Sequence, residues 1–111
     1  MGWFRRRRGR TRPGSREDER HLRTWAQART GVEAYVEPRT AVTETTVVLV
    51  AADGEWTRRR ISDPAAARKL GRSLGIPVYD VQLVGYPQRM RDYEARRRAL
   101  RERQRREDLG A

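Results

Sequence analysis

Apolar residues are concentrated in the middle of the chain, between about residues 32 and 86, with strongly polar stretches on either side. Within this region, 32–37 (VEAYVE) alternates apolar with polar residues and is followed by Pro38, a pattern typical of a half-buried strand. The segments 43–52 and 55–61 are rich in β-branched residues and are separated by an Asp-Gly pair. Because glycine adopts positive φ angles cheaply, this pair predicts a tight turn and an antiparallel hairpin.

Three other segments carry the spacing and the terminal residues of helices. The first follows Ser15, has three acids in its first turn, extends for about 14 residues and stops before Gly31. Its apolar face is narrow, so we expect it to dock only at the edge of the core. The second begins after a capping Asp63 and a proline and ends at Gly75. The third starts near Gln88 and contains acid-before-base pairs at i, i+4, which stabilise isolated helices.

The segment 76–84 (IPVYDVQLV) predicts a last strand, broken by the Gly-Tyr-Pro that follows it. The predicted order is therefore α-β-β-β-α-β-α. This order is typical of an α+β fold in which a small antiparallel sheet packs against helices. The pattern leaves the order of the strands within the sheet open.

Charge divides the chain more sharply than hydrophobicity does. The net charge is +11, from 26 basic and 15 acidic residues, and all but one of the basic residues are arginines. Residues 1–16 carry +7, residues 17–84 carry zero and residues 85–111 carry +4. We therefore expect a disordered arginine-rich arm at 1–16, a compact core domain at 17–87 and a basic C-terminal helix at 88–111.

Signatures of catalysis are missing from the sequence. The chain has no cysteine and a single histidine, His21, which excludes cysteine–histidine catalysis and multi-histidine metal sites. It has no glycine-rich dinucleotide or phosphate-loop motif. It also has no apolar run long enough to span a membrane or to act as a secretory signal. We therefore expect a non-enzymatic, cytoplasmic protein without a cofactor or a metal.

Arginine clusters beside aromatic residues are the remaining candidates for function. Alternation along the strand 55–61 places Trp56, Arg58 and Arg60 on one face, which would offer phosphate contacts and a stacking plane. Alternatively, Trp56 belongs to the core and the arginines cover an open sheet face. The segment 86–93 (YPQRMRDY) either forms a second aromatic and arginine surface or is the start of a helix pinned to the core.

These clusters favour a protein that binds nucleic acid and is associated with RNA or with the ribosome. RNA is favoured over DNA because no helix-turn-helix is recognisable. An unpaired run of arginines is attracted to any polyanion. An adaptor that binds an acidic protein is the alternative, and attachment to a membrane surface through Trp3 and Phe4 is a further one. The candidate nucleic-acid contacts are Arg5, Arg6, Arg7, Arg8, Arg10, Arg12, Trp56, Arg58, Arg60, Tyr86, Arg89, Arg91, Arg96, Arg97 and Arg98.

The segments GEWTRRR, IPVYDVQLVGYP and QRMRDY, together with the opening MGWFRRRR, resemble a family of short, basic, uncharacterised actinobacterial proteins. The resemblance covers about residues 32–93 and the first eight residues. It implies an actinobacterial, cytoplasmic origin. Members of this family are sometimes labelled oxidoreductases, a third possible function for which the chain has no cofactor motif.

Overall fold

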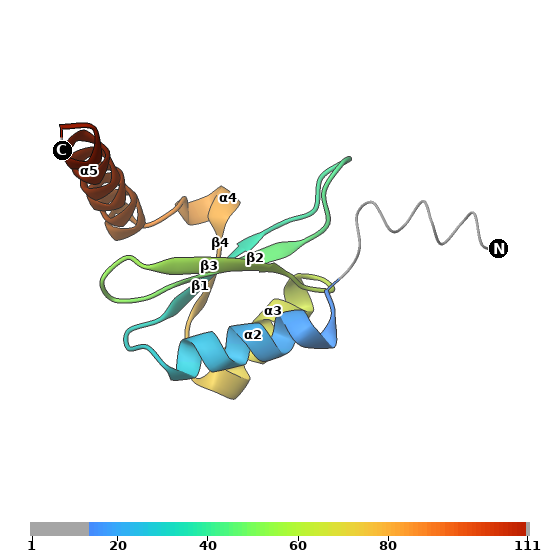
Figure 1. Ribbon diagram of the computed structural model, residues 1–111. Helices are drawn as coiled ribbons and strands as arrows, with labels where there is room; N and C mark the ends of the chain where they lie inside the picture. Colours follow the sequence, from blue (N-terminus) through green and yellow to red (C-terminus); the bar gives the residue numbers. More distant parts are fainter. Residues whose placement is uncertain (1–13, 111) are drawn as a thin grey trace.

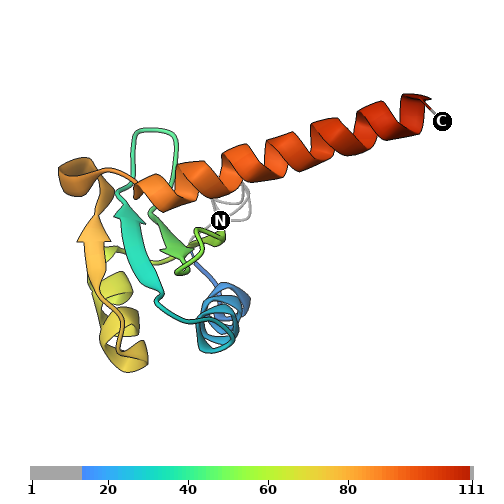
Figure 2. The ribbon, with the colours of Figure 1, turned by 90° about the vertical axis from the view of Figure 1, so that its left-hand side faces the viewer.

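A mixed four-stranded sheet separates two helices on one side from a long helix on the other in the computed structural model, which describes residues 14–110 (Figure 1, Figure 2). The strands are β1 (Glu33–Glu37), β2 (Thr46–Val50), β3 (Trp56–Arg60) and β4 (Val78–Asp80). The helices are α2 (Arg16–Gln27), α3 (Pro64–Leu74), α4 (Val81–Val84) and α5 (Gln88–Gly110). The predicted α+β class and the predicted order of elements are confirmed, with the single turn α4 as an addition.

The strands are arranged β3-β2-β1-β4. The predicted hairpin is confirmed, because β2 and β3 pair antiparallel with Val50 opposite Trp56. Strand β1 is antiparallel to β2, whereas β4 runs parallel to β1 with Tyr79 opposite Tyr35. The sheet is therefore mixed and not wholly antiparallel, because helix α3 provides the crossover that a parallel strand requires.

The prediction of one strand over 76–84 is wrong in its second half. Only Val78–Asp80 pairs with the sheet, and the chain then turns into α4. The side chain of Asp80 accepts a hydrogen bond of 2.7 Å from the backbone N–H of Gln82 and so caps the helical turn. The apolar alternation suited a strand, but the capping aspartate ends it and leaves Leu83 exposed.

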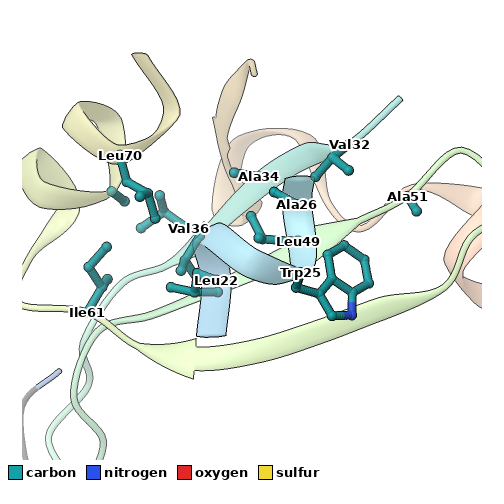
Figure 3. Close-up of a cluster of buried hydrophobic side chains, with 12 residues drawn as sticks. Leu22, Trp25, Ala26, Val32, Ala34, Val36, Leu49, Ala51, Ile61 and Leu70 are labelled. Atoms are coloured by element: carbon teal, nitrogen blue, oxygen red, sulfur yellow. The ribbon is translucent and has the colours of Figure 1, made fainter. Parts of the chain in front are cut away.

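The main core lies between the sheet and helices α2 and α3 (Figure 3). Leu22 of α2 and Val47 and Leu49 of β2 are fully buried. Helix α2 therefore covers the sheet, and the expectation that it docks only at the edge is wrong. The large buried ring of Trp25 widens its narrow apolar stripe.

The opposite face of the sheet is covered by the first turns of α5. Tyr35, Val48 and Val50 form a second cluster there with Met90 of α5. All three central residues of β1 are consequently buried, so this strand is not half-buried as its alternation predicted. The sheet is thus the middle layer of the domain, and its two faces carry different helices (Figure 2).

Candidate nucleic-acid interface

Trp56 packs against the second cluster and does not stand free. Its indole Nε1 donates a hydrogen bond of 2.9 Å to Oε1 of Glu94 on α5. Arg58 lies over the indole ring, with its Cζ atom 5.2 Å from the ring centroid. The predicted shared face of Trp56 and Arg58 is present, but the arginine already occupies one side of the stacking plane. These contacts favour the interpretation of Trp56 as a packing residue.

Glu37 is the centre of a polar network on this face. Arg58 donates two hydrogen bonds to its carboxylate, at 2.7 and 2.9 Å, and Thr46 and Tyr86 donate one each. Burial alone would raise the pKa of Glu37, but the hydrogen bonds from Arg58, Thr46 and Tyr86 outweigh it and hold the pKa below its ordinary value. Burial and the bond to Glu37 raise the pKa of the Tyr86 hydroxyl.

Arg89 fastens the first turn of α5 to the sheet. Its guanidinium donates to the backbone oxygen of Ala51 at 2.9 Å and to Oε1 of Glu33 at 2.7 Å. The hydroxyl of Tyr35 donates to the same carboxylate, and burial together with this bond raises the pKa of Tyr35 to about 12. Arg58, Arg89, Trp56 and Tyr86 therefore all have intramolecular partners, and a role for them in binding nucleic acid stays a prediction.

The network predicts loss of stability in acid. Because the pKa of Glu37 is lower in the folded than in the unfolded protein, its contribution is present above about pH 4.5 and is lost as the pH falls through the folded value. The variant Glu37→Gln should be less stable at neutral pH and should show a shallower decline below pH 4.5 in urea unfolding. The exposed Glu107→Gln serves as the control. A decline as steep in Glu37→Gln as in the parent protein would contradict the role of the network.

Most acids of the electrically neutral body have structural partners. Three aspartates make capping hydrogen bonds at the starts of helices, and four glutamates pair with arginines; these are Asp18, Asp63, Asp80, Glu19, Glu33, Glu37 and Glu55. Many cations are free of such pairing. Within residues 14–110, no ion pair involves Arg16, Arg20, Arg39, Arg60, Arg68, Lys69 or Arg72. Zero net charge over 17–84 therefore coexists with exposed positive surface.

The second half of α5 projects beyond the body (Figure 2). Every residue from 95 to 110 is exposed, and seven arginines and three acids give this segment +4. At 1.5 Å per residue the segment is about 24 Å long. Arg96 donates to the backbone oxygen of Asp53 at 2.8 Å, and Arg96 and Arg97 lie over the Tyr93 ring. Among the described residues, Arg98 and Arg101 have no ion-pair partner.

Arg91, Arg98 and Arg105 follow one another at intervals of seven residues, with Arg101 between the last two, so they share one side of α5. Where this arginine stripe (Arg91, Arg98, Arg101 and Arg105) meets the body there is a hollow of about 370 Å³, lined by Tyr86, Met90, Arg91, Glu94 and Arg98. Three predicted contacts, Tyr86, Arg91 and Arg98, are therefore brought together.

The other predicted contacts are dispersed. Arg60 ends β3 and lines a separate groove on the side of α2 and α3. The six arginines predicted between positions 5 and 12 lie outside the described residues. The contacts predicted from the sequence did not include Arg101 and Arg105, although their spacing of three and seven residues from Arg98 places them on the same side of a helix.

Neither a membrane span nor a metal site is found in the part of the chain that the structure describes. No helix in 14–110 combines the length and the hydrophobicity needed to cross a bilayer. No group of three or more histidine or acidic side chains in the same residues is placed to hold a metal ion. Comparison of the chain with protein-family models, with curated proteins and with solved structures finds no significant match to any of them.

Proposed function

We propose that this chain is a non-catalytic RNA-binding protein that grips phosphate groups with its basic ends. The observation that carries the proposal is the exposed half of α5, a continuous helix on which seven exposed arginines lie. Arginine binds phosphate through two parallel N–H groups and stays charged at any physiological pH. A solvated arginine face that is held away from the body is suited to a large polyanion.

The spacing of the arginines in the stripe supports contact with the sugar–phosphate backbone of RNA. Arginines seven residues apart on a helix are separated by about 10.5 Å, so Arg91, Arg98 and Arg105 span about 21 Å. The hollow beside Arg91 and Arg98 adds apolar surface from Met90 and the ring of Tyr86. An unstacked base could enter there between the two cations, and unpaired bases are typical of RNA loops. Association with the ribosome, an abundant source of such loops, is the more specific form of the proposal.

The stripe is tested by exchanging Arg98, Arg101 and Arg105 for glutamine, which keeps the helix but removes three charges. The dissociation constant for a single-stranded RNA at low salt should rise at least tenfold. The slope of log affinity against log salt should fall by about 2, at ~0.7 per phosphate contact. Fluorescence anisotropy over a salt series measures both quantities.

The matched control replaces Arg39, Arg68 and Arg72, three exposed arginines distant from the stripe in the sequence, with glutamine. It removes the same charge and should change the affinity much less. Equal losses in the two variants would show that only net charge matters and would reject the assignment to α5. Absence of RNA binding by the parent protein would reject the proposed function itself.

An adaptor for an acidic protein is the second candidate, and one observation favours it. Leu100 and Leu109 on α5 are 56% and 81% exposed, so the same helix also offers apolar contacts to a partner. Capture experiments in nuclease-treated lysate separate the two functions. A protein retained without ribosomal RNA, and lost in Leu100→Ala, would favour the adaptor.

A further inference from the structure

Helices α2 and α3 lie on the opposite face of the sheet from α5 (Figure 1). A second positively charged site lies between them. It is a groove of about 590 Å³. Arg16, Glu19 and Arg23 line it from α2, and Lys69 and Ser73 line it from α3. Arg60 and Ser62 close the end nearest to β3. Four cations and one acid therefore surround the groove, although the body as a whole is neutral.

Three of these cations have no ion-pair or hydrogen-bond partner for their side chains within residues 14–110. They are Arg16 and Lys69, which are exposed, and Arg60, which is partly exposed. Arg23, by contrast, is held in place. It forms an ion pair of 3.0 Å with Glu19 and donates a hydrogen bond of 2.7 Å to the Ser73 hydroxyl, which links α2 to α3. The groove therefore has one oriented guanidinium and three cations whose donors are available.

The chemistry of this lining suits phosphate oxygens. A guanidinium, an ammonium and serine hydroxyls all donate hydrogen bonds, and phosphate is an acceptor that favours such charged donors. Arg16 and Arg23 are seven residues apart on α2, about 10.5 Å along the axis. This spacing allows each arginine to contact a different phosphate, so it suits successive groups of an extended strand.

The groove also lies where the basic N-terminal segment joins the body. Gly14 lines it, and a Cβ atom at this position would lie 2.7 Å from the backbone oxygen of Arg60 and from Cα of Ile61. The backbone at Gly14 is thus in close contact with the end of β3. Residues 1–13, which carry six arginines and no acid, precede Gly14 directly in the sequence.

We infer that the groove between α2 and α3 is a second phosphate-binding site, which takes consecutive phosphodiester groups of a nucleic-acid strand. The identity of the strand as RNA rests on the proposed function, whereas the affinity for phosphate rests on the groove itself. Because the sheet separates this groove from α5, the protein would contact two separate segments of RNA, one on each face.

The test uses the full chain labelled with ¹⁵N and a hexauridylate strand as the probe. Binding should shift the amide resonances of Ser62 and Ser73 saturably. The groove variant, Arg16→Gln with Lys69→Gln, should weaken the binding measured at these resonances at least fivefold. Arg68→Gln with Arg72→Gln removes the same charge from α3 outside the groove lining and should weaken it less than twofold.

Further measurements distinguish between the possible ligands, and between the groove and α5 as the site of binding. Inorganic phosphate at the same concentration should shift these resonances far less than hexauridylate, and equal shifts would overturn the strand assignment in favour of a small phosphate compound. Shifts from neither probe would overturn the site. Retention of the groove shifts in the α5 stripe variant, together with unchanged total affinity, would reject α5 as the RNA surface but keep the groove.

Discussion

Gly54→Ala is expected to lower the free energy of unfolding by about 3 kcal/mol. Gly54 has a φ of 95°, which an alanine adopts only with strain of about 1–2 kcal/mol. A Cβ atom here would also overlap the backbone oxygen of Arg89 and approach Cβ of Tyr93 to 2.9 Å. The hairpin turn and the first turns of α5 are in direct backbone contact, so neither can move without the other.

Gly75 provides the matched control for backbone strain. Its φ is 70°, but no atom lies within 4 Å of a Cβ placed there. Gly75→Ala should therefore cost only about 1 kcal/mol. Urea unfolding followed by circular dichroism measures both variants. Equal destabilisation of the two would mean that the close contact between the turn and α5 contributes nothing.

This contact also bears on function, because it directs the exposed half of α5. Arg96 donates to the backbone of Asp53 in the same turn, and Arg89 donates to Ala51 just before it. The β2–β3 turn therefore holds the first turns of α5 in place, and the arginine stripe extends from this attached part of the helix. A helix attached by a flexible linker would lose more conformational entropy on binding RNA.

Local sequence signals were sufficient to predict the helices and strands whose ends are set by neighbouring residues. As predicted, α2 starts after Ser15, Asp63 caps α3, and Gly75 ends α3, where it has a left-handed conformation. The structure adds that Ser15 and Asp18 form a reciprocal capping box. The Asp-Gly pair likewise specified the hairpin. These features depend on contacts within about five residues, which a sequence displays directly.

Contacts between segments that are distant in the sequence could not be predicted from it. Arg58 and Glu37 are 21 positions apart, and Arg89 and Glu33 are 56 apart, so no local pattern marks them as partners. The predicted site treated Arg58 and Arg89 as available, whereas the fold gives both a carboxylate. The groove was missed for the same reason, because Arg16 and Lys69 meet only when α2 and α3 pack side by side.

Pairing explains why the net charge of a segment is a poor guide to its surface. The body has as many acids as bases, but buried or partly buried geometry assigns many of the acids to caps and to ion pairs, with Asp18 only 4% exposed. The acids are held at particular places, so cations without an acidic partner can gather elsewhere on the surface, where they attract anions locally. The folded body can therefore contribute to binding a polyanion even though the sum of its charges is zero.

Removal of the arginines from the N-terminal arm should give the largest change in affinity for RNA. Exchanging its six arginines at positions 5, 6, 7, 8, 10 and 12 for glutamine leaves Gly14 and the capping Ser15 in place, so helix α2 keeps its start. If each arginine neutralises one phosphate of a single-stranded RNA, the salt slope should fall by about 4, and the affinity at low salt by about a hundredfold. A chain that begins at Gly14 should behave like this variant, because the charge and not the length of the arm is what matters. Unchanged RNA affinity in both proteins, with unfolding curves equal to those of the parent, would leave the arm no part in binding and assign the whole attraction to α5 and the groove.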